Sequence, residues 1–100
     1  MNEKTKMDPV AVSPCVYVLE LMDGCMYVGI TYQLNFRLAQ HWSGKGSKWT
    51  QEHKPIAVKE IIYPATTDDE NEKTVELMKK YGYDKVRGGK WTKVSSQYCP

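Results

Sequence analysis

Four side chains in the first half of the chain could do chemistry if the fold brought them together. Arg37 and His41 are four residues apart, so on a helix their side chains would be neighbours. A guanidinium can bind a phosphate group, and an imidazole, which titrates near neutral pH, can accept or relay a proton. Tyr17 and Tyr27 precede them in two runs rich in β-branched residues. By themselves, an arginine and a histidine at this spacing are more typical of the solvated surface of an amphipathic helix.

The turn between the two runs decides whether the tyrosines share a site, because side chains alternate faces along a strand. A two-residue turn would point them to opposite faces. A three-residue loop at 22–24, built as a type I turn followed by a left-handed glycine, places Leu19 opposite Tyr27 and Tyr17 diagonally beside it. We therefore predict a positive φ at Gly24. Simple cross-strand packing of two aromatic rings is the alternative interpretation of the pair.

The two faces of this hairpin differ in character. The face with the tyrosines would also carry Cys15, Leu19 and Gly29, where a small residue lets a substrate backbone or a tyrosine ring come close. The other face is predicted to be the core side, and its members are branched or apolar: Val16, Val18, Met26, Val28 and Ile30.

Periodicity and cap signals predict the other elements. We expect strands at 15–22, 25–31 and 56–63, the last partly buried on both faces, and helices at 34–42 and 67–81. In the first helix one side would carry Leu34, Leu38 and Trp42. Thr67 and Glu70 are predicted to form a capping box that starts the second helix, and Gly82 is predicted to end it. The segment 83–91 is expected to be a short turn or helix that covers the core.

These elements predict an α+β fold with a small three-stranded, mostly antiparallel sheet flanked by helices. One hundred residues allow one small domain, expected at 14–93, with a flexible leader at 1–13 and a tail at 94–100. The sequence has no apolar stretch that would span a membrane and no signal-peptide pattern, so we expect an intracellular location, in cytoplasm or nucleus, which includes a viral protein acting there.

The cysteines and the charges limit the chemistry further. Three cysteines without C-x-x-C spacing argue against a zinc site; Cys15 and Cys25 would lie at opposite ends of the hairpin, and Cys99 is expected to be a free thiol. The net charge is only +2, but basic residues crowd the last quarter of the chain after an acidic stretch. That segment suits phosphate contact or, alternatively, a solvated surface. Trp49, in the basic loop after the first helix, is expected to pack the loop down or to stack on a base.

The spacing of these residues resembles the opening of a GIY-YIG nuclease domain. Tyr17 matches the end of the first triplet, Tyr27 the start of the second, Arg37 an arginine ten residues on, and His41 a position that many members fill with histidine. The resemblance continues through 43–50 and 53–55, so it covers roughly residues 14 to 81, and Y-G-Y-D-K-V-R-G-G resembles an ending found in some members. One departure is Cys15, where the family has glycine.

The resemblance implies a DNA endonuclease that uses Mg²⁺ or Mn²⁺ to hydrolyse phosphodiester bonds, in repair, recombination or the processing of branched or nicked DNA. Tyr17 or Tyr27 would orient or deprotonate the attacking water, His41 would assist, and Arg37 would stabilise charge on the phosphate. The nucleic-acid backbone would be contacted by basic side chains, for which we choose Lys45, Lys48, Lys54 and Arg87.

The resemblance also implies one metal-binding glutamate on the later helix. Glu72 and Glu76 are the candidates, and Glu72 is preferred because apolar residues follow it at the third and sixth positions, Val75 and Met78. One carboxylate with waters and a phosphate oxygen is normal ligation for Mg²⁺. The alternative is a catalytically silent nucleic-acid-binding module of the same fold. A protein partner or fused module for targeting, the DNA substrate and the oligomeric state stay open.

Overall fold

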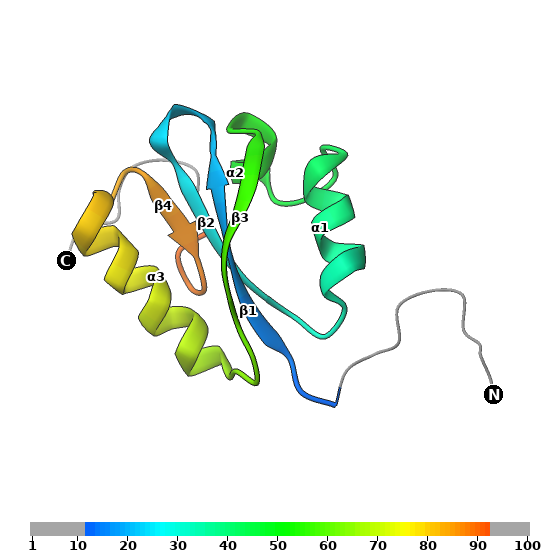
Figure 1. Cartoon of the computed structure of the whole chain (residues 1–100). Coiled ribbons are helices and arrows are strands. Elements are labelled where there is room, and N and C mark those ends of the chain that lie inside the picture. The colour runs from blue at the N-terminus through cyan, green and yellow to red at the C-terminus, as the bar shows by residue number, and fades with distance from the viewer. Residues whose placement is uncertain (1–11, 93–100) are drawn as a thin grey trace.

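The computed structural model describes residues 12–92 and has an α+β fold, as predicted. The leader and tail expected at the two ends fall mainly, and Cys99 entirely, outside these residues. The sheet has four strands in the order β3-β1-β2-β4, one more than predicted. Figure 1 shows the sheet between α3 on one side and α1 on the other. The elements are β1 (Cys15–Leu21), η1 (Met22–Gly24), β2 (Met26–Thr31), α1 (Leu34–Trp42), α2 (Lys48–Glu52), β3 (Pro55–Ile62), α3 (Thr67–Tyr81) and β4 (Val86–Gly88).

The hairpin of β1 and β2 has the predicted three-residue connection. Leu19 pairs with Tyr27 and Tyr17 pairs with Gly29, so both tyrosines lie on one face of the sheet. Gly24 has φ 72°, which confirms the predicted left-handed glycine. The expected type I turn is wrong, however, because Asp23 is left-handed as well, with φ 68°. An aspartate tolerates this conformation better than most residues because its short polar side chain can bond locally.

Both faces of the sheet are buried, whereas the sequence indicated one core side. The predicted core face packs under α3, through Leu77 and Met78. The tyrosine face packs under α1 and α2, where Trp49 is buried and donates a hydrogen bond from Nε1 to the carbonyl oxygen of Met26 at 2.9 Å. Trp49 therefore packs its segment down, one of the two roles expected for it. Cys15 and Cys25 are buried free thiols.

The strand β3 is an edge strand and not the partly buried strand that we expected. It pairs antiparallel with β1, with two register shifts. Its apolar side chains are largely exposed because the two cores lie over β1 and β2 instead, and only Ile62 packs against one of them. The exposed members on and beside β3 are Ile56, Val58, Ile61 and Tyr63.

Helix α1 has the predicted bounds, but its buried side differs. Leu34 and Leu38 pack against the tyrosine face as expected. Trp42, expected on the same side as the two leucines, is 47% exposed, whereas His41 from the neighbouring side is 1% exposed. The basic loop that should follow α1 is shorter than predicted, because α2 begins at Lys48.

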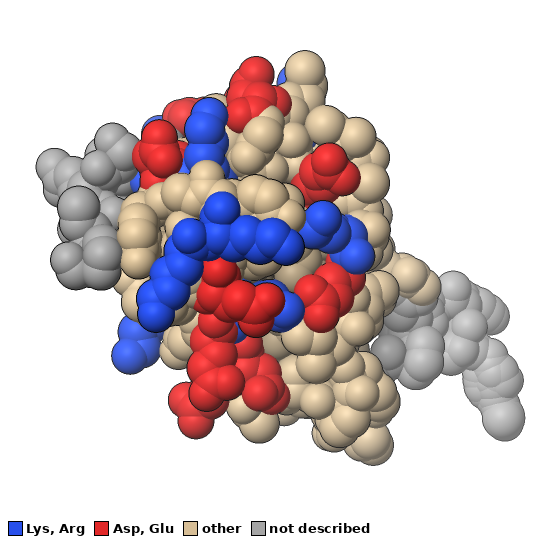
Figure 2. All heavy atoms as spheres, turned by 60° about the vertical axis from the view of Figure 1, so that its left-hand side comes forward, with Lys and Arg blue, Asp and Glu red and all other residues tan. Residues whose placement is uncertain are grey.

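Helix α3 begins one residue earlier than predicted. The N-cap is Thr66, and the reciprocal partner at the third helical position is Asp69, where we had expected Thr67 and Glu70. The helix ends at Gly82 as predicted. The segment after it is not simply a turn or helix, because Val86–Gly88 forms β4, parallel to β2. Figure 2 shows a row of basic side chains across this part of the molecule, with acidic side chains directly beside it.

Within residues 12–92 every helix is too short or too polar to cross a bilayer.

Candidate active site

Three of the predicted site residues meet on the face of the sheet that α1 covers. Tyr17 and Tyr27 come from the adjacent strands β1 and β2, and their ring centroids lie 6.3 Å apart. His41 reaches them from the last turn of α1, with its ring centroid 5.7 Å from that of Tyr17 and 5.1 Å from that of Tyr27. Tyr17 Oη and His41 Nε2 form a buried hydrogen bond of 2.8 Å. The fold therefore brings together residues that are up to 24 positions apart.

Two glycines make this close packing possible. A Cβ atom at Gly29 would overlap the ring and hydroxyl of Tyr17, which confirms the expected close approach of a tyrosine there. A Cβ atom at Gly46 would overlap His41 Nδ1. Both rings are thus held against backbone that has no side chain, so their positions are fixed from one side by the chain itself.

Arg37 supplies the positive charge of the site. It is half-buried on α1, and its Nη1 donates a hydrogen bond to Gln40 Oε1 at 2.8 Å. Burial raises the pKa of both Tyr17 and Tyr27, while the charge of Arg37 and its hydrogen bonds to the two hydroxyls act in the opposite direction. Burial, assisted by the same arginine, lowers the pKa of His41 to about 4. At neutral pH the site therefore holds neutral phenols, a neutral imidazole and one guanidinium.

Thr50 and Ser47 complete the surroundings of His41, and sequence reasoning did not identify either. His41 Nδ1 and Thr50 Oγ1 lie 3.0 Å apart, and the Thr50 hydroxyl donates to the Ser47 carbonyl oxygen at 3.0 Å. Ser47 is the N-cap of α2, and its side-chain oxygen accepts from the Thr50 N–H at 3.2 Å. A serine placed before K-W-T is the kind of cap signal that would have located this short helix.

Glu70 is a carboxylate whose charge affects the pKa of both tyrosines. Sequence reasoning gave it a capping role instead. Its negative charge raises the pKa of Tyr17 and of Tyr27. Burial raises the pKa of Glu70 itself, and a hydrogen bond from the Gly89 N–H partly offsets this. Because Asp69 takes the capping role, Glu70 is not needed for capping. Recognising Thr66 as the cap would have shown this from the sequence.

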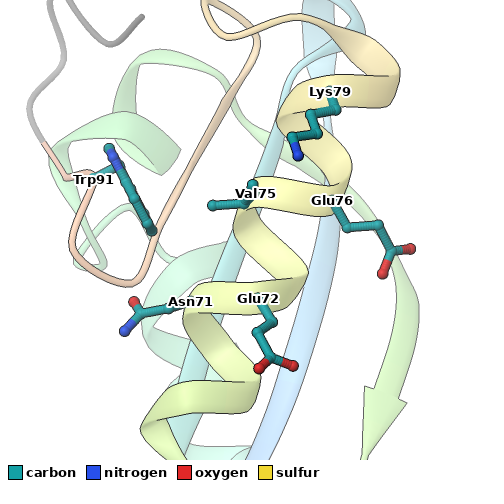
Figure 3. Close-up of a pocket in the computed structure, with 6 residues that line it drawn as sticks. All are labelled: Asn71, Glu72, Val75, Glu76, Lys79 and Trp91. Atoms are coloured by element: carbon teal, nitrogen blue, oxygen red, sulfur yellow. The ribbon is translucent and has the colours of Figure 1, made fainter. Parts of the chain in front are cut away.

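Glu72 and Glu76 lie elsewhere. They line a hollow of about 410 Å³ on the outer side of α3, together with Val75, Lys79, Asn71 and Trp91. Figure 3 shows Val75 directed toward Trp91, and the two carboxylates directed away from it. Glu76 accepts a hydrogen bond from Lys73 at 3.2 Å, and neither carboxylate is among the groups that shift the tyrosine pKa values. The metal assignment to Glu72 stays a prediction.

The basic residues expected to contact nucleic acid divide into two groups. Lys45, Lys48 and Lys54 are exposed, and Lys54 lines a hollow of about 470 Å³ that also reaches His41. Arg87 is 0% exposed: its Nη1 donates to the Tyr83 carbonyl oxygen at 2.7 Å, and its guanidinium lies 4.6 Å from the centre of the Trp49 ring. The prediction for Arg87 is therefore wrong, because β4 places this side chain inside the fold.

A metal in this site would be held mainly by water and substrate. Within residues 12–92, no three His, Cys, Asp or Glu side chains gather closely enough to bind an ion by themselves. A single half-buried carboxylate whose charge acts on the two tyrosines nevertheless suits Mg²⁺, which usually keeps several waters and takes one or two carboxylates with substrate oxygens. The residues present therefore fit a one-carboxylate site at Glu70.

Comparison with known proteins identifies a family. A family model described as the GIY-YIG catalytic domain matches residues 13–85. A UPF0213 protein of Cupriavidus pinatubonensis is 39% identical over 54 residues, which cover 53% of this chain and 60% of the relative. A UPF0213 protein of Bacillus cereus is 43% identical over 49 residues, covering 49% of this chain and 51% of the relative.

A third relative, a UPF0213 protein of Streptococcus pneumoniae, is 49% identical over 48 residues, covering 48% of this chain and 46% of the relative. The chain thus spans about half of the length of the curated relatives that it matches. No solved structure matches it.

Proposed function

The chain belongs to the GIY-YIG family, and we propose that it is a divalent-metal-dependent endonuclease that hydrolyses phosphodiester bonds in DNA. The family indicates a nuclease-type function; the metal dependence and the DNA substrate are our proposal. The observation that carries it is the buried hydrogen bond of 2.8 Å between Tyr17 Oη and His41 Nε2, beside the guanidinium of Arg37. A phenol joined to a neutral imidazole is a proton-accepting pair, and an arginine next to it is a phosphate anchor.

The roles follow from these contacts. Arg37 binds the scissile phosphate and stabilises the charge that develops on it. Tyr17 takes a proton from the attacking water while its own proton passes to His41, because Nε2 is the acceptor within reach of its hydroxyl. Tyr27 lies beside both rings and orients the water or the phosphate. Lys45, Lys48 and Lys54 bind the neighbouring backbone phosphates from the exposed side of the site.

We propose Glu70, in place of Glu72, as the carboxylate that holds the metal. The support is electrostatic: Glu70 is close enough to the two tyrosines to raise the pKa of each, and it is half-buried on the first turn of α3. When bound, Mg²⁺ or Mn²⁺ would polarise the phosphate and stabilise the leaving oxygen. The phosphate binding and the proton transfer described above are roles of the protein side chains and not of the metal.

The test is cleavage of a labelled panel of duplex, single-stranded, flap, nicked and branched DNA with Mg²⁺ or Mn²⁺. The wild-type chain is compared with Glu70→Gln and Glu72→Gln, and with Glu76→Gln as the control on the same helix. We expect metal-dependent cutting that is lost only in Glu70→Gln, and the preferred DNA would distinguish a repair or branched-DNA substrate from plain duplex. Loss only in Glu72→Gln would restore the sequence-based assignment. Binding without cutting by the wild-type chain would instead support a silent binding module or a missing partner.

A further inference from the structure

The contacts of His41 specify which of its nitrogens carries the proton. We propose that Thr50 is a positioning residue that fixes His41 as the Nδ1–H tautomer, so that Nε2 presents its lone pair to Tyr17. This inference rests on the proposed function for its catalytic meaning, but the tautomer itself is a property of the folded chain. Thr50 and His41 are each 1% exposed, so the protein and not bulk solvent determines the arrangement.

On the Nδ1 side, the single proton of the Thr50 hydroxyl favours an arrangement in which Nδ1 donates to Thr50 Oγ1. The Thr50 hydroxyl has one proton, and the Ser47 carbonyl oxygen at 3.0 Å can only accept it. With that proton committed, Thr50 Oγ1 faces His41 Nδ1 at 3.0 Å as an acceptor. Nδ1 must then be the donor, and it carries the imidazole proton.

On the Nε2 side, the contacts of Tyr17 require the same tautomer. Arg37 can only donate, so it cannot receive the Tyr17 hydroxyl proton. Within the part of the chain that the structure describes, the acceptor for that proton is His41 Nε2, at 2.8 Å. The opposite tautomer would aim two donors, Nε2–H and the guanidinium, at one phenol oxygen and would leave the phenol proton without a protein acceptor. Leaving such a buried group unsatisfied costs about 1–3 kcal/mol.

The fold fixes this geometry from several directions. Thr50 is held at the start of α2 by its N-cap, Ser47, in two ways: the Thr50 hydroxyl donates to the Ser47 carbonyl oxygen at 3.0 Å, and the Ser47 hydroxyl donates to Thr50 Oγ1 at 3.2 Å. Gly46 lies against Nδ1 with no space for a Cβ atom. The imidazole is therefore confined between a glycine backbone, the Thr50 oxygen and the Tyr17 hydroxyl.

The tautomer has a direct consequence for proton transfer. As water attacks the phosphate, one water O–H bond breaks and a new O–H bond forms on Tyr17 Oη. The original phenol O–H bond breaks and an N–H bond forms on His41 Nε2. The imidazolium that results keeps its Nδ1–H bond to Thr50 Oγ1, so the same oxygen that fixes the tautomer also stabilises the charged product of the transfer. With the proton on Nε2 from the start, His41 could not accept.

The experiment is ¹⁵N NMR of the histidine side chains, which distinguishes a protonated from an unprotonated ring nitrogen directly. The wild-type chain is compared with Thr50→Val, Thr50→Ser and, as the control for loss of a buried threonine hydroxyl elsewhere, Thr74→Val. His53 serves as an internal reference, and His41→Asn assigns the signals. We expect the Nδ1–H form in the wild type, Thr50→Ser and Thr74→Val, and a mixture or the Nε2–H form in Thr50→Val.

A second readout is the pH titration of His41 in the same samples. Its titration midpoint should be lower in Thr50→Val than in Thr50→Ser, because the imidazolium loses an acceptor. A wild-type Nε2–H form, or an unchanged tautomer in Thr50→Val, would overturn the proposal. If Thr50→Val does not fold, the tautomer of the wild-type chain and the His41 titration in Thr50→Ser still test the proposal. An Nε2–H form in the wild type would overturn it.

The two proposals fail separately. An Nδ1–H tautomer in a chain that does not cut DNA would sink the nuclease function and leave the role of Thr50 in place. If the wild-type chain cuts DNA but its His41 is the Nε2–H tautomer, the nuclease function would stand and the role of Thr50 would be rejected.

Discussion

The hydroxyl of Tyr17 is the group on which the proposed chemistry depends most. It is joined to His41 Nε2 at 2.8 Å, whereas Tyr27 has only ring contact with that histidine. We therefore expect Tyr17→Phe to lower the cleavage rate about 10²–10⁴-fold, the usual range for loss of a general base, and Tyr27→Phe to lower it less. Single-turnover cleavage at saturating enzyme measures both. A larger loss in Tyr27→Phe would assign the base to that tyrosine.

The substitution Gly29→Ala tests the packing of the Tyr17 ring. An added methyl group would overlap the Tyr17 ring and hydroxyl. Overpacking of a buried site typically costs about 1–3 kcal/mol, so Gly29→Ala should lower the free energy of unfolding by that amount. Urea unfolding followed by tryptophan fluorescence measures it. Gly24→Asn is the matched control, since asparagine tolerates a left-handed turn and nothing lies within 4 Å of that position. Equal effects in the two variants would contradict the packing argument.

At this scale the sequence predicted how the proposed site residues lie together, but not their supports. Alternation in a hairpin puts Tyr17 and Tyr27 on one face, and helical spacing makes Arg37 and His41 neighbours, which are local rules. Their catalytic roles came from the resemblance to the GIY-YIG family. The contact of Thr50 with His41 joins the end of one helix to the start of the next, and no periodicity carries that information.

Among the elements, the cap of α3 has the clearest consequence. Thr66 and Asp69 exchange hydrogen bonds at the helix start, with the Thr66 N–H donating to Asp69 Oδ2 at 2.8 Å. Thr66→Ala should therefore lower the free energy of unfolding by about 1 kcal/mol, the typical contribution of an N-cap. Thr67→Ala, which removes the cap first predicted from the sequence, should change it by no more than about 0.5 kcal/mol. Urea denaturation of the two variants decides between the two caps, and a larger loss in Thr67→Ala would reject the observed one.

A shift of one residue in that cap explains why sequence reasoning did not consider Glu70 as a candidate for the metal carboxylate. If Thr67 were the cap, the Glu70 side chain would bond back to the cap residue. The candidates for the metal carboxylate would then be the glutamates further along the helix, Glu72 and Glu76. With Thr66 as the cap, Asp69 takes the capping role, and the charge of Glu70 raises the pKa of Tyr17 instead. Helix boundaries are uncertain by a residue or two in any sequence, and one residue turns a helical side chain by about 100°.

The elements that sequence reasoning missed are the shortest ones. The strand β4 has three residues and exists because it pairs with β2, and α2 has five residues and is fixed by the burial of Trp49. Neither is long enough to show its own periodicity. The helix at Leu34–Trp42 and the two hairpin strands are longer and have amphipathic or alternating patterns, so their positions followed from the sequence.

At the scale of the whole molecule, the sheet separates two cores with different tasks. The core under α3 is made of aliphatic and methionine side chains. The core under α1 and α2 contains the two tyrosines, and His41 and Thr50 are buried beside it. Polar groups at such depth are tolerated only when they are hydrogen-bonded, as these are. The stability of the fold and the geometry of the site are therefore coupled through His41.

That coupling predicts how the stability of the whole chain depends on pH. Burial lowers the pKa of His41 from 6.5 to about 4 in the folded state. As the pH falls below 6.5 the unfolded chain takes up the proton first, so the folded state loses stability until the pH reaches about 4. The loss attributable to this group is up to about 3 kcal/mol, at 1.36 kcal/mol per pKa unit.

His41→Asn, which cannot titrate in this range, isolates the effect. The free energy of unfolding of each chain, measured by urea denaturation from pH 7.5 to 4, should fall more steeply in the wild type, and the gap between the two curves should narrow as the pH falls. Other titrating groups, including Glu70, contribute to both curves and cancel in the difference. Parallel curves would mean that His41 is protonated equally easily in the folded and unfolded chains. The neutral, hydrogen-bonded imidazole on which both proposals depend would then have to be abandoned.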